Sequence, residues 1–123
     1  MMKIRLAIWF LVIASLVGCS SNYIVELQNG YKIWFMSATK VYIGNHEDSL
    51  VVGPNVEGLY AKDHYIVGIV DNSDVGYFVI DTVKNTVKKN LSKKIWKTEL
   101  LAIGLSKDIS LVPPTTNFKI HHD

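Results

Sequence analysis

Residues 64–82 read HYIVGIVDNSDVGYFVIDT, two apolar runs separated by a short polar segment. The runs 64–70 and 76–81 are rich in β-branched and aromatic residues, and residues 71–74 are the Asp, Asn and Ser typical of turns. This pattern predicts an antiparallel hairpin. Because neither run alternates between apolar and polar residues, we expect both strands to be covered on both faces, at the centre of a sheet.

Shorter β-rich segments continue the pattern on both sides of this hairpin, separated by turn residues. Asn29-Gly30 predicts a tight hairpin turn, because both residues tolerate positive φ. A turn is also expected at Gly53-Pro54-Asn55. The further strands are expected at residues 23–27, 31–36, 39–43, 49–52, 56–60, 86–88 and 109–112.

The period of the apolar residues changes after residue 92. Trp96, Leu100 and Ile103 recur at helical spacing, and Ser92 suits the N-cap of a helix that runs from Lys93 to Ile103. The sequence therefore predicts an α+β fold, a mainly antiparallel β-sheet in meander order with one C-terminal helix. Residues 23–113 would form a single domain, and residues 114–123 a flexible C-terminal tail.

The N-terminus has the layout of a secretory signal peptide. A basic start, Met1-Met2-Lys3-Ile4-Arg5, precedes an apolar run over residues 6–17. This run of 12 residues is shorter than the roughly 20 residues of a transmembrane helix. Residues 1–18 are therefore expected to be removed.

The residues that follow this run resemble the lipobox of bacterial lipoproteins. Leu16 stands three places before Cys19, Gly18 directly precedes it, and Ser20-Ser21 follow. The resemblance implies that diacylglycerol is attached to the Cys19 thiol, and that residues 19–22 form a short lipidated tether. Since no aspartate follows the cysteine, it implies the outer membrane facing the periplasm in a Gram-negative cell. In a Gram-positive cell it implies the outer leaflet of the plasma membrane.

Residues 50–105 also resemble a pattern in small bacterial lipoproteins that have no assigned activity. The similarity is carried by Val52-Gly53-Pro54-Asn55-Val56, by residues 76–82 and by residues 91–96. These are strand and turn residues, so the resemblance implies only strands followed by one helix. It implies no catalytic residue.

Composition narrows the class of function once residues 1–18 are set aside. The remaining 105 residues carry 11 lysines, no arginine and 11 acidic residues, which gives no net charge. A neutral chain without arginine is unsuited to binding nucleic acid. Cys19 is the only cysteine, so no disulfide can form within the chain.

The sequence contains no set of residues that predicts a catalytic site, a metal site or a cofactor. His46-Glu47-Asp48 is expected to be a solvated loop, and residues 71–76 lack the ligand spacing of a calcium loop. His121-His122-Asp123 has no supporting residues around it. The enzymatic alternative is an envelope hydrolase with a carboxylate pair drawn from Glu57, Asp63, Asp81 and Glu99.

Two features predict binding. Six lysines lie within 14 residues that contain no acid, and they suit anionic headgroups or an acidic partner, or simply form a solvated face. They are Lys84, Lys88, Lys89, Lys93, Lys94 and Lys97. Trp34 is the second feature, because Tyr31, Ile33 and Phe35 already supply the inward face of its strand and leave Trp34 for a partner surface.

The sequence therefore predicts a lipid-anchored lipoprotein with a binding, protective or accessory role at the bacterial cell envelope. Its partners would be membrane lipid, through Cys19, and an envelope protein. The alternatives are the hydrolase and a structural component of the envelope. Carboxylates gathered in one buried cleft would favour the hydrolase, and dispersed carboxylates would favour binding.

Overall fold

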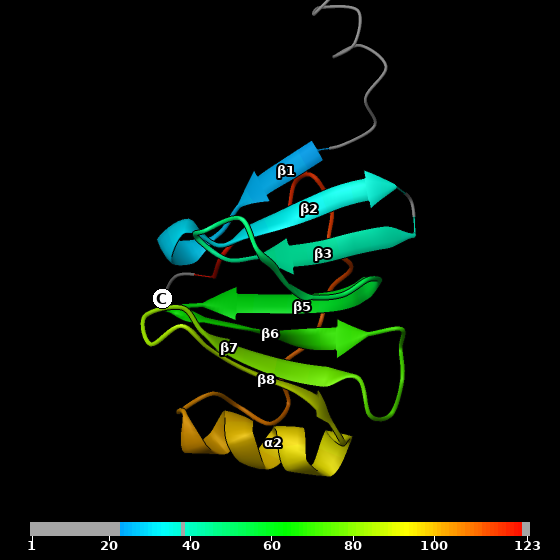
Figure 1. Ribbon diagram of the computed structural model, residues 1–123. Helices are drawn as coiled ribbons and strands as arrows, with labels where there is room; N and C mark the ends of the chain where they lie inside the picture. Colours follow the sequence, from blue (N-terminus) through cyan, green and yellow to red (C-terminus); the bar gives the residue numbers. More distant parts are fainter. Residues whose placement is uncertain (1–22, 38, 122–123) are drawn as a thin grey trace, which may run out of the picture.

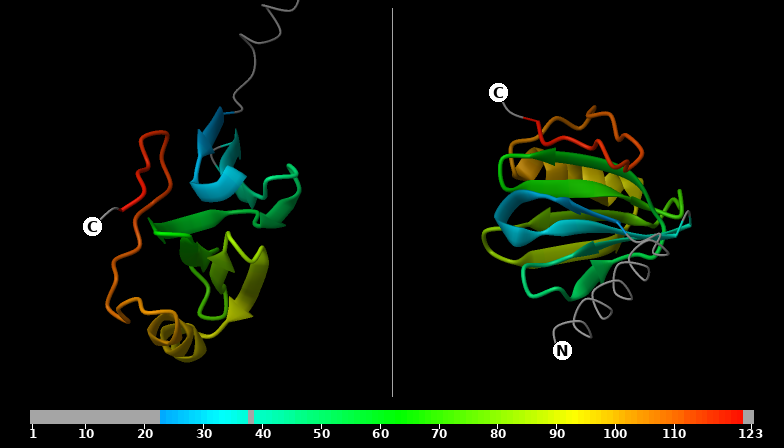
Figure 2. Two further views of the ribbon diagram at one scale, coloured as in Figure 1. Left: turned by 90° about the vertical axis from the view of Figure 1, so that its left-hand side faces the viewer. Right: turned by 90° about the horizontal axis from the view of Figure 1, so that it is seen from above.

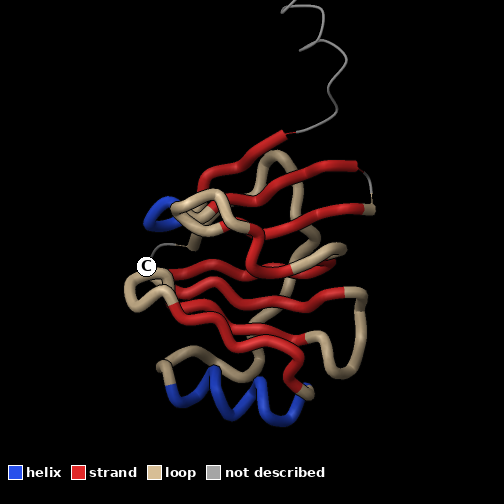
Figure 3. The backbone as a smooth tube through the Cα atoms, in the orientation of Figure 1, coloured by secondary structure: helices blue, strands red, loops and turns tan. Residues whose placement is uncertain are grey.

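The computed structural model describes residues 23–37 and 39–121, and it contains two four-stranded antiparallel sheets and one α-helix (Figures 1 and 3). This confirms the predicted α+β class. The elements are β1 (Tyr23–Glu26), the 3-10 turn η1 (Gln28–Gly30), β2 (Lys32–Ser37), β3 (Lys40–Gly44), β4 (Leu50–Val52), β5 (Val56–Lys62), β6 (Tyr65–Val70), β7 (Tyr77–Asp81), β8 (Thr86–Leu91) and α2 (Lys93–Ala102).

Three layers stack in the order first sheet, second sheet, helix (Figure 1). Each sheet is a meander, in which every strand pairs with its neighbour in sequence: β1 to β4 in the first sheet and β5 to β8 in the second. One apolar cluster joins the inner faces of the two sheets, and a second joins the other face of the second sheet to α2. Within the described part of the chain, no helix is long and apolar enough to cross a membrane.

The β6–β7 hairpin occupies the two central positions of the second sheet, as the sequence predicts. Ile66 and Phe78 lie in the cluster between the sheets, whereas Val67 and Val79 lie in the cluster under α2. All four side chains are buried. The continuous apolar runs therefore arise because this hairpin has a packed layer on each side.

The predicted helix is confirmed, and its last turn differs by one residue. Ser92 Oγ accepts a hydrogen bond from the Ile95 amide at 3.3 Å. The helix ends at Ala102, with Ile103 as the C-cap and Gly104 at φ 86°. The positive φ of Gly104 turns the chain back, since glycine adopts this conformation without steric cost.

The connection at Asn29-Gly30 is longer than the predicted tight turn. Both residues have positive φ, as expected, but β1 ends at Glu26 and β2 begins at Lys32. The intervening Leu27 and Tyr31 are buried in the cluster between the sheets. The loop is therefore wider because two large side chains enter the core from it.

The C-terminal segment lacks the predicted strand, but it makes more contacts with the sheets than a flexible tail would. Residues 109–112 form no strand, and only Val112 bridges Leu59, with hydrogen bonds of 2.8 and 3.0 Å. Residues 112–121 run along one side of the sheets (Figure 2), and the His121 amide donates to the Ala61 carbonyl at 2.7 Å. Phe118 also packs against the core between the sheets. This part of the predicted flexible tail thus covers the edge of β5.

Candidate functional site

The structure separates the lysines that the sequence groups together. Lys88 and Lys89 are neighbours on β8 and make contacts in opposite directions. Lys88 Nζ lies 2.8 Å from Glu99 Oε1 on α2. Lys89 Nζ donates to the Val51 carbonyl at 3.3 Å, which links the two sheets. Both lysines therefore tie layers of the fold together.

Lys93 and Lys97 lie beside a cavity of about 250 Å³, which we call the lysine cavity. Its third lysine is Lys107, in the segment that follows α2. This segment returns beside the helix because the chain reverses at Gly104 and Leu105 is buried. The other residues that line the lysine cavity are Tyr77, Trp96, Asp108, Ile109 and Leu111.

Excess positive charge distinguishes the lysine cavity from two other cavities. Among the described residues, Lys93, Lys97 and Lys107 form no ion pair, and the only acid in the lining is Asp108. A cavity of about 300 Å³ beside Glu99 has two lysines and two acids in its lining. The three unpaired ammonium groups suit a carboxylate or another anionic group of a partner. Lys94 is exposed nearby on α2.

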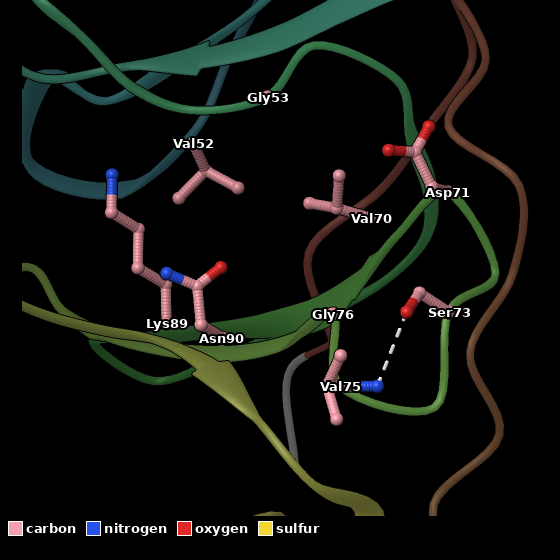
Figure 4. A pocket seen from close by; sticks show the side chains of 9 residues that line it. All are labelled: Val52, Gly53, Val70, Asp71, Ser73, Val75, Gly76, Lys89 and Asn90. Atoms are coloured by element: carbon pink, nitrogen blue, oxygen red, sulfur yellow. Dashed lines mark hydrogen bonds between the residues drawn. The ribbon is translucent and has the colours of Figure 1, made fainter.

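A third cavity, of about 240 Å³, lies where the β4–β5 turn, the β6–β7 loop and β8 meet (Figure 4). Lys89 and Asp71 stand on opposite sides of it, so its charges balance. Asp71 accepts a hydrogen bond from Asn55 Nδ2 at 3.0 Å, and Ser73 Oγ accepts one from the Val75 amide at 3.2 Å. These polar groups hold the loops in place, which fits the hairpin loop predicted for residues 71–76.

Trp34 lies on the outer face of the first sheet, as its position in β2 predicts. In the register of the sheet, Trp34 is directly opposite Ile24 on β1 and Tyr42 on β3. The indole lies across Gly44, where an added Cβ would be 2.6 Å from Trp34 Nε1. Glycine is therefore required at position 44 for this half-buried arrangement.

The four candidate carboxylates lie on different elements. Glu57 is on β5, Asp63 is exposed in the β5–β6 turn, and Glu99 pairs with Lys88. Asp81 is buried and accepts hydrogen bonds from the amides of the two residues that begin the next turn, at 3.0 and 2.9 Å. Asp81 and Glu99 line the same cavity of about 300 Å³, and both are engaged there in local contacts, Asp81 with backbone amides and Glu99 with Lys88.

The residues considered as metal ligands do not assemble into a site within the described ranges. No group of three or more His, Cys, Asp or Glu side chains gathers there. Asp48 pairs with Lys32 at 3.0 Å, and the His121 ring stacks on Tyr60 with centroids 4.6 Å apart. Cys19, His122 and Asp123 lie outside the described residues.

Because Tyr31 is buried, the free energy of unfolding is expected to decrease at alkaline pH. Burial, and secondly the negative charge of Asp81, raise the pKa of its hydroxyl above the ordinary value of 10.0. The unfolded chain therefore loses this proton at lower pH than the folded protein does. The associated stability is present below about pH 10 and is lost as the pH rises through the folded-state pKa.

The raised pKa predicts that Tyr31→Phe loses less stability than the wild type at alkaline pH. Urea unfolding is measured at pH 8 and pH 11, and the free energy of unfolding should fall more for the wild type than for the variant. The variant serves as its own control for lysine titration, because all lysines are retained. Equal decreases in the two proteins would contradict the conclusion that titration of Tyr31 lowers the stability.

Sequence reasoning missed Lys107 and the aromatic lining of the lysine cavity. Lys107 stands ten residues after Lys97 and outside the lysine-rich stretch. Only the reversal after α2 brings it beside Lys93 and Lys97, and the glycine at position 104 was the one local signal for that reversal. Comparisons of the chain with protein-family models, with curated proteins and with solved structures find no match.

Proposed function

We propose that this protein is a lipid-anchored binding module of the bacterial cell envelope, which captures an acidic envelope protein at the lysine cavity. The observation that carries the proposal is the group of three lysines without counter-ions, Lys93, Lys97 and Lys107, around one cavity. The lipobox-like residues around Cys19 support the anchor.

The layer order supports a protein partner rather than lipid headgroups as the source of negative charge. The residues expected to form the tether precede β1, in the first sheet. Residues of α2 line the lysine cavity. This helix lies on the other side of the second sheet from the first sheet (Figure 1). An anchor at Cys19 would therefore hold the first sheet near the membrane and leave the lysine cavity facing away from it.

Asp81 and Glu99 line a common cavity, and the local contacts that engage both carboxylates support binding over the alternative hydrolase. Hydrolysis of a glycan by a carboxylate pair requires two acids to face the same bond. Asp81 accepts backbone hydrogen bonds, and Glu99 pairs with Lys88. A purely structural role would not account for three unpaired lysines around one cavity.

The test is recovery of a partner with the lipidated protein from solubilised membranes, followed by mass spectrometry. The triple variant Lys93→Gln, Lys97→Gln, Lys107→Gln is expected to lower recovery of the main partner about tenfold. Exposed ion pairs contribute about 0.2–1 kcal/mol each, and three such losses together give a factor of this size.

The matched control is Lys40→Gln, Lys84→Gln, Lys119→Gln, which removes the same charge from exposed lysines outside the lysine cavity. This control should retain the partner. Equal loss in both variants would indicate a general charge effect, and no loss in the first variant would remove the lysine cavity from the proposal.

A further inference from the structure

The first sheet has one packed face and one face that the described helix does not cover. Its inner face packs on the second sheet, while α2 lies on the far side of that second sheet. The outer face carries Ile24, Trp34 and Tyr42 side by side on three strands. Ile24 is 42% exposed, and Leu50 on β4 is 44% exposed.

We propose that this outer face rests on the membrane surface, with Trp34 and Tyr42 at the level of the lipid headgroups. The inference rests on the proposed anchor at Cys19 and adds the orientation of the domain. Trp and Tyr are enriched at membrane–water interfaces, because their rings are apolar and carry one polar group. Ile24 and Leu50 would lose contact with water in the same arrangement.

The length of the tether limits how far this face can lie from the anchor. Tyr23, the first residue of β1, follows Cys19 by four residues. Four residues span at most about 14 Å, even when fully extended. Ile24 is the next residue of β1 and points to the outer face, opposite Trp34. An acylated Cys19 therefore keeps this side of the first sheet within reach of the headgroups.

The charges on the outer side of the first sheet balance, so the proposed membrane contact should depend only weakly on anionic lipid. Lys32 pairs with Asp48 at 3.0 Å, and the exposed Glu26 and Lys40 have opposite charges. The contact would therefore depend on the aromatic and aliphatic side chains, and it should persist on vesicles of phosphatidylcholine alone.

The indole N–H of Trp34 indicates that Trp34→Phe is a suitable variant for testing this contact. Its Nε1 is buried and has no hydrogen-bond partner among the described residues. An unpaired buried donor opposes folding, and phenylalanine would fill much of the same space without one. Trp34→Phe should therefore fold as well as the wild type.

The experiment uses quenching of tryptophan fluorescence by brominated phosphatidylcholine. Removal of residues 1–18 also removes Trp9, so the lipidated protein retains Trp34 and Trp96. Trp96 is only 3% exposed, under α2, and serves as an internal reference far from the first sheet. The wild type and Trp34→Phe are reconstituted into vesicles with lipid brominated near the headgroups and into unbrominated vesicles.

We expect brominated lipid to lower the wild-type emission by about one third or more, and to leave the emission of Trp34→Phe unchanged. Equal emission in both vesicles, with the wild type floating with the lipid, would overturn the inference and leave the anchor intact. A dimer in detergent that Trp34→Phe dissociates would also overturn it, since a second copy would then cover this face. An intact mass without diacylglycerol would overturn the anchor and the inference together.

Discussion

Trp96→Ala is expected to lower the free energy of unfolding by about 3–5 kcal/mol. The Trp96 side chain is 3% exposed and is the largest group that joins α2 to the second sheet. Its ring lies 4.6 Å from that of Tyr77, centroid to centroid, and its Nε1 donates to the Phe78 carbonyl at 3.0 Å. The substitution removes this packing and leaves a buried carbonyl without its donor.

Urea unfolding followed by circular dichroism measures this effect, with Ile95→Ala as the control on the same helix. Ile95 is 52% exposed, so its truncation should change the free energy of unfolding by no more than about 0.5 kcal/mol. Trp96→Phe retains one aromatic ring but loses the hydrogen bond and part of the buried indole, so its effect should fall between the two. A decrease below 1 kcal/mol for Trp96→Ala would show that α2 is not held through this residue.

Cys19→Ala should abolish membrane retention and incorporation of labelled fatty acid. Buried acyl chains contribute about 0.8 kcal/mol per CH₂, and two or more chains hold a protein on a bilayer stably. The proposed contact of the outer face is much smaller and should not retain the protein alone. The measurement is fractionation of cells grown with labelled palmitate, followed by detection of the protein in each fraction.

Ser20→Ala is the control for this experiment, because it alters the neighbouring residue and retains the thiol. It should remain in the membrane fraction and incorporate label. Unchanged membrane association of Cys19→Ala would remove the lipoprotein assignment, and with it the orientation proposed for the first sheet.

Local patterns predicted most elements of the fold. The two-sided apolar runs identified β6 and β7 as central strands, and the spacing of Trp96 and Leu100 identified the buried face of α2. The alternation of side chains along β2 predicted that Trp34 lies on the outer face of the first sheet, because the adjacent Ile33 points inward. Each of these predictions depends on neighbours within a few residues, which is the range over which periodicity carries information.

The division into two sheets could not be predicted in the same way. Gly53-Pro54-Asn55 predicted a turn, and it is also the point where the chain leaves the first sheet for the second. A turn that continues a sheet and a turn that begins a new one use the same residue types. The choice depends on how distant side chains such as Ile43 and Ile66 pack together.

The lysine cavity could not be predicted from local patterns either, because it depends on contacts between residues far apart in the sequence. The lysine-rich stretch predicted one charged face, but strand geometry and ion pairing assign Lys88 and Lys89 to structural contacts. Lys93 and Lys97 line the lysine cavity without ion pairs to any described residue, and Lys107 joins them there. Charge in the sequence is therefore a poor guide to charge available for binding until the pairs are known.

The contact of residues 112–121 with β5 has a consequence for the order in which the protein folds. Every strand pairs with its neighbour in sequence, so both sheets can form by successive hairpins as the chain is synthesised. The segment that covers the edge of β5 follows all eight strands in the chain. Until it docks, that edge is an open template on which a strand of another nascent chain can add, so docking of this segment closes one route to aggregation.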